Sequence, residues 1–234
     1  VSDCNFSFNS SYQGGAGVYL MDTNASFVDC TFYLNTAGVT GSGAAAYIEE
    51  SNVSFSRTNF MMNSSHLEGG AVFLKNSFID LNNSLFQENK SLTANGGGAI
   101  YLTGGHFSFD QSIFSSNSAS YQGGSIYLSD SNGSILRTVF SGNQNTASNG
   151  AGAVYLNRSS PEISDCNFTS NSTSANNFGG AIKSVDSSPS ISNNLFSFNS
   201  SANGGGAIYI DSNSVPAFSS NTFLSNSASI AGGA

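Results

Sequence analysis

The chain has 234 residues, only 9% of them charged, and a formal net charge of −8. Its six lysine and arginine residues are scattered and too few to neutralise a nucleic-acid backbone, so we expect no nucleic-acid partner. They are equally few for binding anionic lipid. Because no apolar run approaches the roughly 18–20 residues of a membrane helix, we also expect no membrane insertion in this segment.

One short pattern, F-x-x-N, recurs along the whole chain. Successive phenylalanines are 26, 28, 26, 28, 26, 28, 28 and 27 residues apart, and such a period is typical of repeat architectures. The nine phenylalanines are Phe6, Phe32, Phe60, Phe86, Phe114, Phe140, Phe168, Phe196 and Phe223. The asparagines three residues after them are Asn9, Asn35, Asn63, Asn89, Asn117, Asn143, Asn171, Asn199 and Asn226.

Each F-x-x-N is followed by a polar corner rich in glycine and then by a short apolar strand, such as Ala99-Ile100-Tyr101-Leu102. The segments are too short, and glycine and proline too frequent, for helices. We therefore predict an all-β fold, a parallel β-solenoid of about nine coils of 26–28 residues, with residues 1–234 forming one continuous body. The chain opens in mid-repeat, which suggests a segment of a longer repeat protein.

Side chains alternate between the two faces of a strand, so the apolar strand predicts which residues face inward. Its second and fourth positions are apolar in nearly every unit and should point into the core. The first and third positions should then point outward, and we expect the third to form an exposed aromatic column. Its members are Tyr19, Tyr47, Phe73, Tyr101, Tyr127, Tyr155 and Tyr209, with Lys183 in the same column.

The F-x-x-N residues themselves predict stacking rather than chemistry. The phenylalanine column should be a buried core, and the asparagine column an amide ladder that satisfies buried polar groups at a bend. Charges also share positions on neighbouring coils, so we expect ion pairs between Asp29 and Arg57, between Arg137 and Asp165, and within Asp130, Arg158 and Asp186.

The three cysteines, Cys4, Cys30 and Cys166, occupy one repeat position, two residues before the repeat phenylalanine. Serine, threonine or asparagine fills that position elsewhere, so we interpret it as a small interior column. Cys4 and Cys30 lie on adjacent coils, which makes a disulfide between them a hypothesis. We expect no metal site, because the two histidines fall at different repeat positions.

The corner between Phe and the next strand is the only part of the repeat that varies regularly, being 11 or 13 residues long. The longer corners, including Leu92 to Gly97 and Gln144 to Ala151, should project over their neighbours. Because length variation concentrates in loops on one face of a solenoid, we expect this face to be where partners bind.

F-x-x-N and Gly-Gly-Ala-(Ile/Val) recur with the same period, and together they resemble the repeat of the polymorphic outer-membrane-protein family of surface adhesins. The second motif stands at Gly69, Gly97, Gly179 and Gly205, with Gly-Gly-Ser-Ile at Gly123. The resemblance covers the whole chain. It implies a right-handed parallel β-helix, an extracellular or cell-surface location, and adhesion.

We also considered an enzyme, because carbohydrate-active proteins use parallel β-helices. Such chemistry needs clustered carboxylates, and here Glu49, Glu50 and Asp22 lie near one corner without a recurring acid–base partner. We therefore expect no catalytic residues and no cofactor. A flat ice-binding array is disfavoured because the small polar stretches are rich in serine rather than threonine.

Twelve N-x-(S/T) sequences occur, and we expect four of them to lie in outward turns open to N-glycosylation. These are at Asn24, Asn52, Asn132 and Asn157. Sequons at ladder positions such as Asn9 and Asn63 should be inaccessible.

The sequence thus predicts a non-enzymatic extracellular solenoid that forms part of a surface filament, stalk or adhesin. Its expected partners are further copies, bound end to end or laterally, or cell-surface glycans or proteins. The alternative is a carbohydrate-binding or carbohydrate-active β-helix, similar to pectate lyases, that uses the outward tyrosine face.

Overall fold

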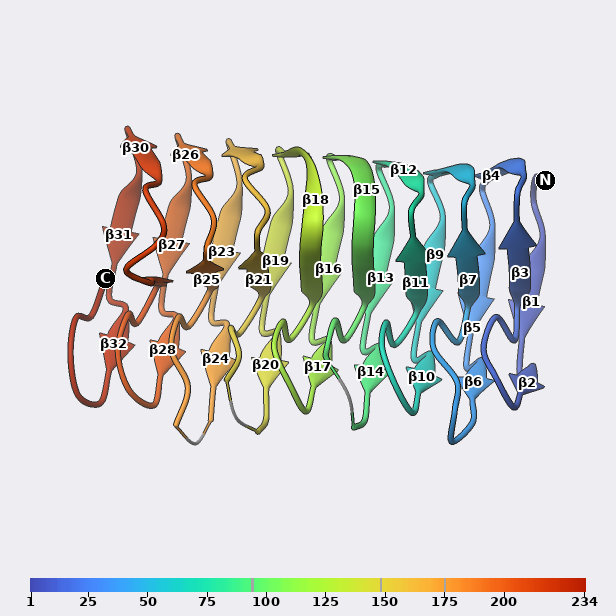
Figure 1. Ribbon diagram of the computed structural model, residues 1–234, viewed down its shortest axis with the longest axis horizontal. Helices are drawn as coiled ribbons and strands as arrows, with labels where there is room; N and C mark the ends of the chain where they lie inside the picture. The colour runs from blue at the N-terminus through green and yellow to red at the C-terminus, as the bar shows by residue number, and fades with distance from the viewer. Residues whose placement is uncertain (94, 148, 175) are drawn as a thin grey trace.

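The computed structural model describes residues 1–93, 95–147, 149–174 and 176–234, which form a stack of β-coils along one axis (Figure 1). Every strand pair in the described residues is parallel, and each strand inside a sheet bonds to its equivalents one repeat earlier and later. The predicted all-β solenoid is therefore confirmed.

The F-x-x-N strands form one nine-stranded sheet, here called the Phe sheet. Its members are β1 (Asn5–Ser7), β5 (Thr31–Tyr33), β9 (Asn59–Met61), β13 (Leu85–Gln87), β16 (Ile113–Ser115), β19 (Val139–Ser141), β23 (Asn167–Thr169), β27 (Leu195–Ser197) and β31 (Thr222–Leu224). Phenylalanine pairs with phenylalanine in register throughout, for example Phe86 with Phe114.

A second nine-stranded sheet, here the short sheet, follows the asparagine corner and has two residues per strand. It consists of β2 (Ser10–Ser11), β6 (Thr36–Ala37), β10 (Ser64–Ser65), β14 (Lys90–Ser91), β17 (Ser118–Ala119), β20 (Gln144–Asn145), β24 (Ser172–Thr173), β28 (Ser200–Ser201) and β32 (Ser227–Ala228).

The third sheet, here the long sheet, has 14 strands and carries the aromatic column. Its first part comprises β3 (Val18–Met21), β7 (Ala46–Glu49), β11 (Val72–Lys75), β15 (Ile100–Asp110), β18 (Ile126–Leu136), β21 (Val154–Asn157), β25 (Ile182–Val185) and β29 (Ile208–Ile210). After a corner it continues as β4 (Asn24–Val28), β8 (Asn52–Ser56), β12 (Phe78–Asn82), β22 (Glu162–Ser164), β26 (Ser190–Ser192) and β30 (Ala217–Ser219), while β15 and β18 span both parts.

The core is a set of stacked columns, as the repeat predicts. The phenylalanine rings from Phe32 to Phe196 are fully buried and stack with ring centroids 4.4–5.1 Å apart. Apolar side chains from both parts of the long sheet pack against them in one continuous cluster. The rings at the two ends of the column depart from the prediction, because Phe6 and Phe223 are partly exposed.

The asparagine ladder forms as predicted, and its hydrogen bonds are well shown by one rung. Asn117 Nδ2 donates to the Phe86 carbonyl oxygen at 2.9 Å and to Asn143 Oδ1 at 3.0 Å. Its own Oδ1 accepts from both the backbone N–H and Nδ2 of Asn89, each at 3.0 Å. A buried amide therefore has all its hydrogen-bonding capacity used, which is what a desolvated polar group requires.

The other interior rungs are fully buried and make the same set of bonds. They are Asn35, Asn63, Asn89, Asn143, Asn171 and Asn199.

The two end rungs differ from the buried ladder that we predicted. Asn9 is exposed and donates only forward, from Nδ2 to Asn35 Oδ1 at 2.9 Å. Asn226 is half-buried; its Nδ2 donates to the Phe196 carbonyl oxygen at 2.9 Å, and its Oδ1 accepts from Asn199. Each of these asparagines has a described coil on one side of it only, so solvent reaches the other side.

The corners contain a feature that the sequence analysis did not predict, namely positive φ angles at residues other than glycine. In the described chain, 25 residues other than glycine have φ between 47° and 63°, among them Leu34, Met62 and Ser116 directly before the ladder asparagines. The ladder asparagine after each of these three residues uses its side-chain oxygen to accept a hydrogen bond from the backbone N–H of the equivalent asparagine on the preceding coil. A serine ladder does so at a second corner, as in Ser51 N–H to Ser77 Oγ at 3.1 Å.

One predicted orientation is wrong. The first residue of each apolar strand was expected to face outward, yet Ala71, Ala99 and Ala153 are fully buried. Two consecutive N–H groups, those of Ala71 and Val72, donate to the single carbonyl of Ala99, a bulge that interrupts the alternation of faces. Both residues then point into the core.

The corner strain can be measured at Ser116, which has a φ of 53° and lies beside Gly142 of the next coil. A left-handed conformation costs a side-chain-bearing residue roughly 1–2 kcal/mol, and glycine adds roughly 0.5–1 kcal/mol of unfolded-state entropy. Ser116→Gly should therefore raise the free energy of urea unfolding by about 0.5 kcal/mol. Ser115→Gly, one residue earlier in β16, should lower it by a similar amount.

Candidate binding surface

The aromatic column lies on the outer face of the long sheet, where we expected it, but its exposure falls from the N-terminal end to the middle of the column, and Tyr209 at the other end is half-buried. Tyr19 is 53% exposed, and Tyr47, Phe73 and Tyr101 are half-buried. Tyr127 and Tyr155, predicted to be outward and accessible, are only 6% and 4% exposed. We call the open part, from Tyr19 to Tyr101, the aromatic row.

Residues of the corners cover the aromatic column beyond Tyr101. Ala151, at the end of one corner, packs with Tyr127 and Tyr155 and helps to cover them. Further along, the Phe178 ring lies 4.5 Å from the Tyr209 ring. The predicted projecting corners at Leu92 to Gly97 and Gln144 to Ala151 each include one residue outside the described part of the chain, 94 and 148.

Lys183 occupies the tyrosine position of its coil and is 5% exposed, although we expected an outward side chain. Its Nζ donates to Asn149 Oδ1 at 2.7 Å and lies 5.3–5.7 Å from the Tyr155, Phe178 and Tyr209 rings. Burial lowers the pKa of Lys183. The ammonium thus attaches two corners to the sheet, one through the hydrogen bond to Asn149 and the other through the cation–π contact with Phe178.

Within the aromatic row the rings stack on one another along the solenoid axis. The centroids of Tyr19 and Tyr47 are 4.7 Å apart with planes at 1°, and Phe73 and Tyr101 are 5.4 Å apart at 5°. Because each ring covers the face of its neighbour, the row presents ring edges and hydroxyl groups to solvent. Stacking of sugars on these faces, part of our alternative hypothesis, is therefore disfavoured.

Polar groups flank the aromatic row on both sides. Tyr47 donates its hydroxyl to Glu49 at 3.1 Å, and Lys75 donates to the same carboxylate at 2.6 Å, which holds the pKa of Glu49 below its usual value. On the other side, a shallow hollow of about 260 Å³ separates the rings from the corner residues. Its lining residues are Gln13, Tyr19, Thr40, Ser42, Tyr47 and Phe73.

Burial raises the pKa of Tyr47 and of Tyr155 to about 12, and raises that of Tyr101 as well. Above the ordinary tyrosine pKa of 10.0 the unfolded chain therefore loses protons that the folded chain keeps. Stability should be retained below pH 10 and should fall as the pH rises toward 12. The contribution of Lys183 to the pH dependence of stability has the opposite sign. Because its pKa is lowered in the folded chain, stability rises with pH below the ordinary lysine pKa of 10.5.

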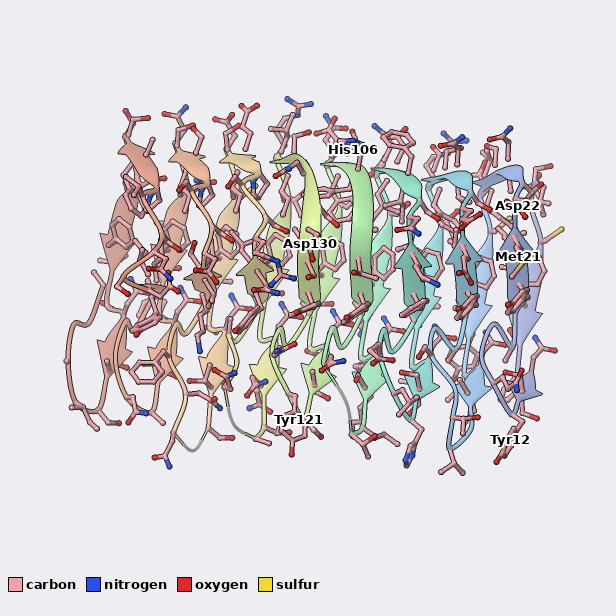
Figure 2. The ribbon with its side chains drawn as sticks, in the orientation of Figure 1. Tyr12, Met21, Asp22, His106, Tyr121 and Asp130 are labelled. Atoms are coloured by element: carbon pink, nitrogen blue, oxygen red, sulfur yellow. The ribbon has the colours of Figure 1, made fainter. Side chains whose placement is uncertain are left out.

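Urea unfolding at several pH values above 10 tests this dependence. The Tyr47→Phe/Tyr101→Phe/Tyr155→Phe variant should lose most of the alkaline decline. Tyr12 and Tyr121 are exposed at the corner edge, as Figure 2 shows, and Tyr12→Phe/Tyr121→Phe should leave the decline unchanged. An equal decline in all three proteins would contradict the prediction.

The predicted ion pairs are partly confirmed. Arg57 pairs with Asp29 at 2.7 Å and Arg158 with Asp130 at 2.7 Å. Arg137 pairs with Asp110 at 2.6 Å rather than with Asp165, because its side chain reaches back to the preceding coil, as those of Arg57 and Arg158 also do. Because these pairs are exposed and solvent screens them, they contribute little to stability.

Cys30 and Cys166 are buried, as predicted for an interior column, whereas Cys4 on the first described coil is exposed, contrary to the prediction. The hypothetical disulfide between Cys4 and Cys30 is not formed, since both are free thiols. Each sulfur instead contacts a backbone carbonyl two residues earlier, Cys4 that of Ser2 at 3.1 Å and Cys30 that of Val28 at 3.3 Å.

The four candidate glycosylation sites lie in strands of the long sheet, not in turns. Asn24, Asn52 and Asn132 are exposed there. Asn157 is half-buried, and its amide donates to Tyr127 Oη at 3.4 Å, which corrects the prediction that it is outward. Of the ladder sequons, Asn63 is buried as expected, whereas Asn9 is exposed.

Of the acidic residues noted at this corner, Glu49 is engaged by Tyr47 and Lys75. Over the described ranges no group of three or more His, Cys, Asp or Glu side chains is arranged to hold a metal ion. In the same part of the chain, no helix combines the length and apolarity that crossing a membrane requires.

Parallel in-register coils, three sheets and a stacked aromatic core define a β-solenoid. The chain belongs to the family described as the right handed beta helix region, which matches residues 1–140 and 70–233. No curated protein matches the chain in sequence. Among solved structures it is similar to PfbA, a surface adhesin of Streptococcus pneumoniae, with 14% identity, a TM-score of 0.30, and coverage of 98% of this chain and 71% of that chain.

Proposed function

We propose that the chain is a non-enzymatic, adhesive β-helix displayed outside the cell, built from repeats of the polymorphic outer-membrane-protein type. The observation that carries the proposal is the aromatic row, in which the edges of four stacked rings on successive coils reach the surface side by side. Exposed aromatic groups of this kind are typical of protein–protein contact surfaces. Its partner is a protein of a cell surface or a second copy packed laterally.

Most polar and charged side chains near the core already have structural partners, which supports a binding rather than a catalytic role. The ladder asparagines and serines are engaged in hydrogen bonds between coils, and four acidic groups, Asp29, Glu49, Asp110 and Asp130, pair with cations. What remains exposed on the aromatic row is suited to contact: hydroxyl groups, ring edges and the shallow hollow beside them.

The proposal is tested with beads that carry the whole chain. We expect them to adhere to cultured cells, to immobilised matrix proteins or to one another, and the chain to release no new reducing ends from polysaccharides. Polysaccharide cleavage would contradict the proposal in favour of the carbohydrate-active alternative. Absence of adhesion to every surface, with a folded protein on the bead, would equally contradict it.

A further inference from the structure

A second hollow lies on the other part of the long sheet, beyond the corner that follows the aromatic row. It has a volume of about 380 Å³ and is formed by the outer faces of β4, β8 and β12. Its lining residues are Asn24, Ala25, Ser26, Asn52, Val53, Ser54, Phe78 and Asp80. We call it the Phe78 hollow. The strands β4 and β12 lie along the upper edge of the rod in Figure 1.

The register explains its shape. Asn24, Asn52 and Phe78 are in-register partners on successive coils, and Ser26, Ser54 and Asp80 form the parallel column two residues on. The serines are small, so they leave a depression. Phe78 and Asp80 on the next coil are larger and close one end of it.

The Phe78 ring is unlike the stacked rings of the rest of the molecule. It is 39% exposed, and within the described residues no other phenylalanine or tyrosine ring is in stacking or edge contact with it. Its in-register neighbours are Asn52 and His106, where the stacked columns have phenylalanine or tyrosine. An apolar ring surface thus borders the hollow and remains free to contact a ligand.

The polar groups around the ring are fixed but not saturated. Asn52 Nδ2 donates to Asn24 Oδ1 at 2.9 Å, and Ser54 Oγ donates to Ser26 Oγ at 2.9 Å. Because an amide has two N–H groups and a carbonyl oxygen, these contacts leave amide donors and the Asn52 oxygen free. The half-buried Asp80 carboxylate makes no hydrogen bond or ion pair with any described residue.

We propose that the Phe78 hollow binds one or two rings of a neutral saccharide. A pyranose presents an apolar C–H face, which suits an exposed aromatic ring, and hydroxyl groups that both donate and accept. The Asp80 carboxylate and the Asn24–Asn52 amide pair supply acceptors and donors for those hydroxyls. The volume is near the lower end of the roughly 300–1,000 Å³ range of small-molecule sites.

The charge defines the saccharide class further. Asp80 is the one charged residue among those that line the hollow, so a uronate or another acidic sugar would place two negative charges together. The site therefore selects neutral sugars over acidic ones. It shares no lining residue with the aromatic row, so it is independent of the proposed adhesive role.

The test is a titration of the whole chain, produced in bacteria so that Asn24 and Asn52 carry no glycan, followed by amide NMR. The probes are the methyl glycosides of glucose, galactose and N-acetylglucosamine, with glucuronate for comparison. We expect at least one neutral glycoside to shift the amides of residues 24–26, 52–54 and 78–80, and glucuronate to leave them unchanged.

Phe78→Ser should weaken this binding at least tenfold. Asp80→Asn, which keeps the side-chain shape, should weaken it several-fold and allow glucuronate to bind. Phe198→Ser removes another exposed ring, directly after strand β27 of the Phe sheet, and should leave the affinity unchanged. The amide spectrum of each variant shows whether it is folded. If Phe78→Ser does not fold, Asp80→Asn still tests the site.

Two outcomes would overturn the proposal. One is that none of the neutral glycosides shifts these amides up to its solubility limit. The other is that binding is unchanged in both the Phe78→Ser and Asp80→Asn proteins. Loss of cell adhesion by variants of the aromatic row has no bearing on either outcome, so the two proposals fail separately.

Discussion

Replacing Asn117 with leucine should lower the free energy of unfolding by about 4 kcal/mol. The side chain is fully buried and takes part in four hydrogen bonds, two as donor and two as acceptor. Leucine has nearly the same shape, so the loss comes from polar groups left without a partner. The backbone N–H and amide of Asn89 lose their acceptor, and the Phe86 carbonyl and Asn143 Oδ1 each lose a donor.

Urea unfolding of Asn117→Leu and of Asn132→Leu measures the effect. Asn132 is exposed on the long sheet, and its replacement should change stability by less than about 0.5 kcal/mol. A loss below about 1 kcal/mol at Asn117 would mean that the ladder contributes little beyond ordinary strand pairing.

The second large effect is expected for Phe114→Ala, which should lower the free energy of unfolding by roughly 3–5 kcal/mol. The ring is fully buried and lies 4.8 Å from Phe86 and 5.1 Å from Phe140, so truncation leaves a cavity bounded by two stacked rings. A solenoid coil contacts only its neighbours, which limits how far the structure can relax to fill that cavity.

Phe78→Ala is the matched control, because it removes the same ring from the outer face of the rod. It should cost less than about 1 kcal/mol. Equal losses at Phe114 and Phe78, measured by thermal or urea unfolding, would contradict the assignment of one column to the core and the other to the surface.

Much of this fold was predictable because a stacked repeat repeats its own contacts. Once Phe86 and Phe114 were placed at the same repeat position, parallel pairing in register followed, and with it the buried rings and the amide ladder. The serine ladder could also have been predicted, since Ser51, Ser77 and Ser131 recur with the period of the asparagines.

What could not be predicted depends on local backbone geometry that side-chain patterns do not encode. The bulge at Ala71 and Val72 turns one column inward, and the left-handed corners occur at residues such as Leu34 that give no signal of it. The burial of Tyr155 depends on how a corner folds, which corner length alone does not specify.

The candidate surfaces were predictable to different degrees. The position of the aromatic column was correct, but its accessible part could not be separated from its covered part without the corners. The Phe78 hollow gave no sequence signal, because it arises where one large ring follows two small serines and two asparagines on stacked coils. Only the register between coils brings these residues together.

Adhesion of beads carrying the Tyr19→Ser/Tyr47→Ser variant tests most directly whether the aromatic row is the contact surface. The control is Tyr12→Ser/Tyr121→Ser, which removes two exposed tyrosines from the corner edge instead, and both proteins should first be shown to be folded by circular dichroism. We predict that the first variant loses most of its adhesion and that the second retains it. Full adhesion by the Tyr19/Tyr47 variant, or an equal loss in both, would contradict the proposed role of the row.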